Sequence, residues 1–298
     1  MSESAIHDLG YKRYVGTRRP PSTRWRVIMR HQIAAGWKTF WRYKAWLGAA
    51  VIVTVIAALF IFLGSDTRFG RRIQTTFSDM ALPFAFDWYG RIAFIITLRL
   101  VATVIATDVQ SGAFTFYFAR STRTFDYLLG KLAGCATLIG GIVIGGSFLV
   151  TLMRLGMAGA ESVSDLVPRL WLLPKTLAIA TLMTLAYSAI PLAFSALVAN
   201  RRAALATWAA WYLLVGAIAN GLGFAFHLPL GAIDVATSIH AVTFHLLDEP
   251  FSLLGPSSAN LPSLTIAVVS LVAQIGIALA IVYVALRRAQ HAGVGGSS

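Results

Sequence analysis

The chain has 298 residues, of which 57% are hydrophobic and only 12% are charged. A typical soluble domain is about one-quarter charged, so this composition, with a mean hydropathy of +0.71, excludes a globule whose whole surface faces water. The formal net charge is +13. The single cysteine, Cys135, excludes an intramolecular disulfide framework and a cysteine-cluster metal site. The sequence therefore predicts an integral membrane protein.

Residues 22–44 predict an amphipathic helix that lies at the membrane surface. Apolar and aromatic residues recur there near helical spacing, from Trp25 through Trp37 to Trp41, and the basic residues fall largely outside that stripe. Such a helix suits an anionic cytoplasmic surface. A plain basic juxtamembrane anchor is the alternative. Ahead of this helix, residues 1–21 form a polar segment expected in the cytoplasm.

Six stretches are long and apolar enough to cross a bilayer as helices, which satisfy their own backbone hydrogen bonds. They cover residues 45–64, 89–107, 132–153, 170–199, 203–226 and 262–286. The expected fold is all-α: a polytopic membrane protein whose six-helix transmembrane domain spans residues 45–286, followed by a tail at 287–298.

The distribution of Lys and Arg predicts the orientation of these spans. Basic residues are frequent before the first span, and they recur after the second, fourth and sixth. The long loop before the last span, residues 227–261, has none. Both termini are therefore expected in the cytoplasm, with that loop on the outer side.

The segment 108–130, between the second and third spans, is too long and too apolar for a simple turn. Its aromatic residues need burial, yet the flanking charges keep the segment out of the bilayer core. We expect a short helix that docks into a hydrophobic groove of a soluble partner. The aromatic residues are Phe114, Phe116, Tyr117, Phe118 and Phe125.

The order of residues in this segment resembles the type-2 ABC permease family, the membrane subunits of ABC exporters. The pattern is an acidic residue, three residues, glycine, an apolar stretch, an arginine-containing turn, tyrosine and a Gly-Lys pair. It is matched by Asp108, Gly112, Arg120, Arg123, Tyr127, Gly130 and Lys131. The resemblance covers nearly the whole chain. It departs from the family at Asp108, where Glu is commoner, at Ala113, where Thr is usual, and at Ser121, where Pro is common.

The resemblance implies that segment 108–130 is a coupling helix seated in a groove of a separate ABC ATP-binding subunit. The residues it assigns to ATPase coupling are Asp108, Gly112, Phe114, Phe116, Tyr117, Phe118, Arg120, Arg123, Tyr127 and Lys131. It also implies a second permease copy or a related permease, surrounding membrane lipid, and a place in the bacterial cytoplasmic (inner) membrane. The chain would then be the permease subunit of an ATP-driven exporter.

No nucleotide chemistry is expected in the chain itself. A phosphate loop needs G-x-x-x-x-G-K-[ST], but the only Gly-Lys pair, Gly130-Lys131, is followed by Leu132 and has Phe125 where the first Gly would stand. ATP and Mg²⁺ are therefore expected in the partner ATPase, with no cofactor in this chain. No nucleic-acid partner is expected.

Two other functions stay open at this point. One is an ABC-type mechanical transmitter that acts on a periplasmic partner without moving cargo, and the other is an ATP-independent channel or carrier. An intramembrane enzyme is disfavoured because all six His lie outside the expected spans and no pair of Asp is clearly inside them.

Charged residues inside a span are candidates for function. Arg99 is expected near the middle of the second span, where it faces a central cavity or bonds to a neighbouring helix. Close helix packing is predicted for the glycines of the third span, of which two stand at G-x-x-x-G spacing, Gly141 and Gly145. The full set is Gly134, Gly140, Gly141, Gly145 and Gly146.

The loop at 227–261 is too apolar to be free, and we expect it to form short helices at the outer face. Its His240 and His245 are five residues apart, which is poor spacing for two ligands on one helix face. A polar rim explains them better than a metal site.

Overall fold

The computed structural model describes residues 23–38, 40–65, 71–114, 117, 123–157, 169–248 and 261–295. Within these residues it is all-helical, and six helical stretches are long and apolar enough to cross a membrane. The prediction of six spans is therefore confirmed. The chain has the architecture of a multi-pass membrane protein.

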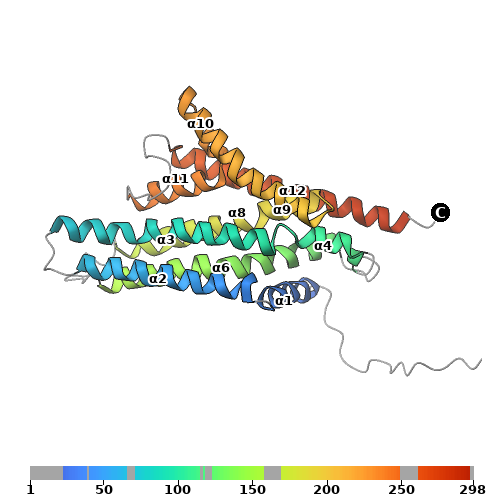
Figure 1. Cartoon of the computed structure of the whole chain (residues 1–298), viewed down its shortest axis with the longest axis horizontal. Coiled ribbons are helices and arrows are strands. Elements are labelled where there is room, and N and C mark those ends of the chain that lie inside the picture. The colour runs from blue at the N-terminus through green and yellow to red at the C-terminus, as the bar shows by residue number, and fades with distance from the viewer. Residues whose placement is uncertain are drawn as a thin grey trace, which may run out of the picture.

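The chain order begins with α1 (Arg24–Trp37) and continues through six spanning stretches (Figure 1). These are α2 (Lys44–Ser65), α3 (Arg71–Leu100) with its short continuation α4 (Val104–Gln110), α6 (Thr124–Met157), α8 (Leu172–Leu197), the α9 (Arg201–Ala210) to α10 (Gly216–Phe226) stretch, and α12 (Leu264–Gly295). Between α10 and α12 lie a 3₁₀ turn at Pro229–Ile233 and α11 (Val235–Leu247).

The second spanning stretch begins earlier than the sequence predicts. It runs from Phe77 to Gln110, whereas the apolar run alone places its start at Tyr89. The added turns contain Asp79 and Asp87, and each carboxylate is paired with an arginine at 2.9 Å. Pairing lowers the cost of burying a charge, so these turns can remain in an apolar helix.

Helix α6 is the centre of the bundle and packs against α1, α2, α3 and α8. Two of the predicted glycines, Gly134 and Gly146, make close contacts, and so does Gly130. A Cβ on Gly130 or Gly134 would lie 2.7 Å from atoms of α1, and a Cβ on Gly146 would lie 2.5 Å from the Tyr89 ring. A Cβ on Gly145 would meet nothing within 4 Å. The predicted G-x-x-x-G pair is thus not where the helices approach most closely.

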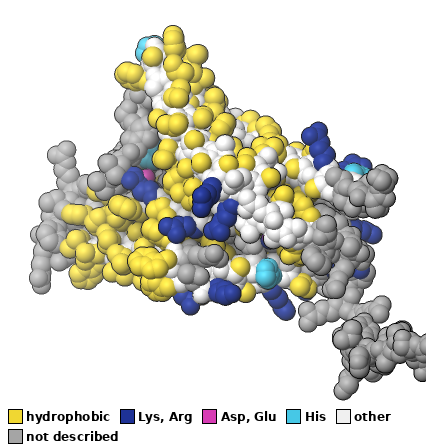
Figure 2. All heavy atoms as spheres, turned by 45° about the vertical axis from the view of Figure 1, so that its right-hand side comes forward, with side chains coloured by type: hydrophobic (Ala, Val, Ile, Leu, Met, Phe, Trp, Pro, Cys, Tyr) yellow, Lys and Arg dark blue, Asp and Glu magenta, His cyan; other side chains and the backbone are white. Residues whose placement is uncertain are grey.

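The fifth span forms an arm that leaves the bundle (Figure 1). Its two α-helical parts, α9 and α10, are joined by a π-helical segment, η3 (Trp211–Val215). Only 11% of its most apolar window is buried, compared with 67% for α8. Side chains along the arm, such as Leu214 and Phe224, are 60% and 66% exposed. Apolar side chains cover the arm in Figure 2.

Both ends of the described chain lie at the same end of the bundle, here named the α1 end; the opposite end is named the α11 end. The hydrogen bond from Thr124 Oγ1 to Gln290 places the end of α12 beside the start of α6. Lys and Arg side chains gather over the end of the molecule that is turned forward in Figure 2. The structure therefore brings the basic segments 24–44, 201–202 and 287–288 to one end.

Candidate functional site

A buried polar group at the α1 end, named the Asp108 cluster, consists of Asp108, Tyr127 and Lys131. The Lys131 Nζ atom lies 2.8 Å from Asp108 Oδ2, and the Tyr127 hydroxyl donates a 2.5 Å hydrogen bond to the same oxygen. The Lys131 side chain is 4% exposed and the Asp108 side chain 17%. Since a buried ammonium needs a partner, this ion pair fixes α4 against α6.

A second contact holds α4 to α8. The Ser195 hydroxyl oxygen in α8 accepts hydrogen bonds from the backbone amides of Ile105, at 2.9 Å, and Ala106, at 3.1 Å. These amides belong to the first turn of α4, where a helix has no carbonyl partners of its own. Helix α4 is therefore tied to two spans, α6 and α8, within a few residues.

The segment that follows α4 turns back toward the Asp108 cluster. Gly112 ends α4 with a φ of +66°, in the left-handed region that favours glycine. The rings of Phe114 and Tyr117 then pack edge-on against the Tyr127 ring, with centroid distances of 5.5 and 5.4 Å. Phe114 and Tyr117, which we expected to be buried in a groove of a partner, thus pack against a residue of the chain itself. Burial, and then the Asp108 charge, raise the pKa of Tyr117.

The other predicted coupling residues divide into two groups. Phe116, Phe118 and Arg120 lie outside the described residues. Arg123 is exposed just before α6 begins. Phe125, an aromatic residue of segment 108–130 outside the coupling set, is 61% exposed in the first turn of α6. An aromatic and a basic side chain therefore stand together on the surface of the α1 end.

Arg99 lies in the last turn of α3 and not at the middle of the span. Its side chain is exposed and lines a cavity of about 180 Å³ together with His31, Lys131 and Arg201. The position differs from the prediction because the span extends so far before Tyr89. Arg99 is thus part of the basic α1 end.

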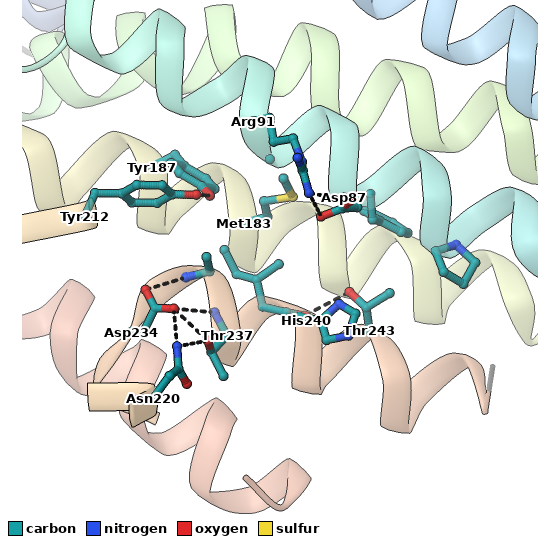
Figure 3. Close-up of a pocket in the computed structure, with 15 residues that line it drawn as sticks. Asp87, Arg91, Met183, Tyr187, Tyr212, Asn220, Asp234, Thr237, His240 and Thr243 are labelled. Carbon is teal, nitrogen blue, oxygen red and sulfur yellow. Dashed lines mark hydrogen bonds and ion pairs between the residues drawn. The ribbon is translucent and has the colours of Figure 1, made fainter. Parts of the chain in front are cut away.

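A larger polar cavity, named the Asp87 cavity, lies between α3, α8, the arm and α11 (Figure 3). Its volume is about 340 Å³. In Figure 3 the Asp87 and Arg91 side chains extend from α3 on one side, and Asp234 and His240 belong to the α11 segment on the other. The Asp87 cavity therefore collects ionisable groups between helices expected to cross a membrane.

The ion pair of Asp87 and Arg91 is made through one guanidinium nitrogen. Arg91 Nη2 lies 2.9 Å from Asp87 Oδ2 and 3.3 Å from Oδ1. The guanidinium also lies 5.2 Å from the centre of the Trp88 ring. Among the described residues, the buried Nε of Arg91 has no hydrogen-bond partner. The pair is thus held in place with part of its hydrogen-bonding capacity unused.

Asp234 caps the start of α11. It accepts hydrogen bonds from the backbone amides of Ala236 and Thr237, from the Thr237 hydroxyl at 2.6 Å, and from the Asn220 amide at 3.3 Å. A Cβ on Gly216 would lie 2.7 Å from the Asp234 carboxylate, so glycine makes room for this cap. Four donors satisfy the carboxylate, which indicates a structural role.

The π-helical segment places Tyr212 on the wall of the cavity. The Tyr212 ring stacks on Phe94 with centroids 3.9 Å apart, and its hydroxyl lies 2.8 Å from the hydroxyl of Tyr187. His240 faces the same space, and burial lowers the pKa of its ring while the charge of Asp87 opposes that shift. π-helical turns often occur at functional sites.

The Asp87 cavity could not be found from the sequence because its lining comes from separate elements. One local signal was present: Asp87 and Arg91 stand four residues apart, a spacing that pairs side chains on a helix.

Within the described residues no three His, Cys, Asp or Glu side chains gather as metal ligands. No protein-family model matches the chain, and no curated protein matches it.

Proposed function

We propose that this chain is the permease subunit of an ATP-driven ABC exporter, which works as a dimer with separate cytoplasmic ATPase subunits. The Asp108 cluster is the observation that carries the proposal. It joins Asp108 and Tyr127 of segment 108–130 to Lys131, which follows it, and all three match the family pattern in order at one end of a six-span bundle. ATP and Mg²⁺ belong to the ATPase in this proposal.

The attachments of α4 support transmission of force. Helix α4 continues from α3, is paired to α6 through Asp108 and Lys131, and is capped by Ser195 of α8. A push on segment 108–130 would therefore reach three spans together. ATP-driven closure of two ATPases could then favour one of two arrangements of the spans, as alternating access requires.

The proposed orientation has the α1 end in the cytoplasm of a bacterium and the chain in the inner membrane. The gathering of basic residues at this end supports it. In this orientation α1 lies along the membrane surface. It packs on α6 through Ile28, Gln32 and Gly36, while Trp37 and the following Trp41 are 41% and 69% exposed and can enter the headgroup layer.

The test is affinity purification of the tagged chain from its native host. We expect an ATPase with a phosphate loop to co-purify. Phe125→Asp should abolish that association, because it places a charge on the exposed aromatic surface of segment 108–130. Phe226→Asp is the matched control, since Phe226 is 65% exposed but ends α10, on the arm.

Three results would overturn the proposal. The first is purification of an intact chain with no ATPase, which would favour an ATP-independent channel or carrier. The second is loss of the ATPase in the Phe226 variant alone. The third is a co-purified ATPase that hydrolyses ATP while no cargo crosses the membrane, which would favour a mechanical transmitter. Monodisperse elution of each variant in detergent shows that the chain is folded.

A further inference from the structure

We propose that the Asp87 cavity binds a zwitterionic group, an ammonium joined to a phosphate or carboxylate, with Arg91 contacting the anion and Asp87 the ammonium. This site is separate from the Asp108 cluster at the α1 end. The inference does not depend on an ATPase, because binding can be measured on the isolated chain.

The ion pair of Asp87 and Arg91 leaves part of its hydrogen-bonding capacity unused. A guanidinium has five N–H donors and an ionised carboxylate has about four acceptor positions. Only Nη2 of Arg91 contacts Asp87, so among the described residues the Nη1 hydrogens are left for a ligand, while the unpartnered Nε is buried. The side chains are 35% and 21% exposed. Each member of the pair can therefore accept a second partner of opposite charge.

A ligand with a single charge fits the Asp87–Arg91 pair poorly. An anion bound to Arg91 would also lie close to the Asp87 carboxylate, which is 2.9 Å from the guanidinium. A cation bound to Asp87 would likewise be repelled by Arg91. Beside the low-dielectric protein these repulsions are stronger than in bulk water. A ligand that carries both charges is attracted at both ends.

Three further polar side chains of the cavity favour the anionic part of such a ligand. Tyr187 and Tyr212 share one hydrogen bond, so one of their two hydroxyl hydrogens is left to donate. His240 makes no hydrogen bond within the described part of the chain, and a neutral imidazole also offers one donor. In Figure 3 the tyrosine hydroxyls lie on the same side of the cavity as Arg91.

A divalent cation does not fit these groups. Asp234 already accepts four hydrogen bonds as the cap of α11, so among the described residues that line this cavity Asp87 is the carboxylate with the most acceptor capacity left. Calcium takes six to eight oxygen ligands and zinc three or four side chains. The charges and the ligand count therefore agree on an organic zwitterion.

The volume limits the size of the ligand. A cavity of 340 Å³ equals the space of about eleven water molecules at about 30 Å³ each. It accommodates a phosphoethanolamine group or an amino acid, but not a whole lipid. Because the cavity lies among spanning helices, the zwitterion could be the headgroup of a membrane lipid or a free solute, and the experiment must separate these sources.

The first arm uses soluble probes on the full chain purified in maltoside detergent. Isothermal titration should show binding of glycerophosphoethanolamine, with glycerol 3-phosphate and ethanolamine each at least about tenfold weaker, since each loses one charged contact. Alanine tests whether a carboxylate can replace the phosphate. Equal binding of glycerol 3-phosphate, or of ethanolamine, would overturn the proposal.

The variants are Asp87→Asn and Arg91→Gln, which remove one charge each with little change of shape. Both should weaken zwitterion binding by about ten- to a hundredfold, the range for a hydrogen bond to a charged group. Asp79→Asn is the matched control. Asp79 is also in α3, but its ion pair is with Arg154 and lies outside the cavity. If Arg91→Gln does not fold, Arg91→Lys keeps the charge and should weaken binding less than Asp87→Asn.

The second arm asks about lipid. The protein is placed in nanodiscs of phosphatidylglycerol with one-fifth phosphatidylethanolamine, and native mass spectrometry counts retained phosphatidylethanolamine. Retention that is lost in Asp87→Asn but kept in Asp79→Asn assigns the site to a lipid headgroup. Probe binding without retention assigns it to a free zwitterion. Failure of both arms, or equal effects of the Asp79 and Asp87 variants, would refute the site.

Discussion

Replacing Asp108 with Leu should be among the most destabilising single changes at the α1 end. It leaves the Lys131 ammonium, whose side chain is 4% exposed, without its carboxylate. Removing one partner of a buried ion pair costs about 3–5 kcal/mol. Lys131→Met should cost less, near the lower end of that range, because Asp108 is 17% exposed and keeps the Tyr127 hydrogen bond.

The double variant Asp108→Leu with Lys131→Met separates this explanation from simple loss of packing. It removes both charges together, so no charge is left buried alone. Replacement of a whole buried pair by apolar side chains is often close to neutral. We therefore expect the double variant to be more stable than Asp108→Leu alone, a strong departure from additivity.

The assay is thermal denaturation in detergent, followed by fluorescence-detected size-exclusion chromatography. At about 2–4 °C per kcal/mol, Asp108→Leu should lower the midpoint by about 6–20 °C. Asp126→Leu is a control in the first turn of α6 with no ion pair among the described residues, and it should lose only about 0.3–1 kcal/mol of helix-dipole interaction. A double variant at least as unstable as the sum of the single variants would refute the buried-pair reasoning.

Gly130→Ala should lower the thermal midpoint because its Cβ would meet the α1 backbone, whereas Gly145→Ala, whose Cβ meets nothing within 4 Å, should not; equal midpoints would contradict the α1–α6 packing. For topology, a membrane-impermeant thiol reagent applied to intact cells should label Met157→Cys at the α11 end but not His291→Cys at the α1 end, and the reverse pattern would invert the proposed orientation. Burial lowers the pKa of His240 below the ordinary 6.5, so the unfolded chain binds more protons below that pH. Lowering the pH from 7.5 to 5.5 should therefore destabilise the wild type more than His240→Gln, and parallel losses in melting temperature would exclude this contribution.

The spans were predictable because apolar length is a local property, and the segments expected at the α1 end do lie together. The start of the second span was not predictable from the sequence. Asp79 and Asp87 are unfavourable in a membrane helix when each is considered alone, and they become acceptable only because each is paired with an arginine. Pairing of Asp79 depends on Arg154, which is 75 residues away in the chain. A hydropathy profile contains no such information.

For the candidate sites too, local patterns indicated residues but not the contacts between distant elements. The resemblance singled out Asp108, Tyr127 and Lys131 as residues, but it did not show that one carboxylate oxygen contacts the other two. The glycine spacing in α6 indicated packing but not its position, because the approach of α1 depends on how the helices cross. The Asp87 cavity needs five elements to meet, and no pattern within one element specifies that meeting.

The π-helical segment in the arm has a consequence for how the fifth span can be compared or altered. A π turn closes hydrogen bonds from i to i+5, so it contains an additional residue relative to an α-helix. A helical wheel drawn with 3.6 residues per turn from Arg201 would misplace each residue after Val215 by about 100° for that additional residue. Gly216 would no longer appear opposite Asp234, nor Asn220 beside Thr237. A one-residue deletion at 211–215 that restores regular α-helical geometry would therefore keep Gly216 and Asn220 facing the α11 cap, whereas the same deletion in α9 would rotate them away by about 100°.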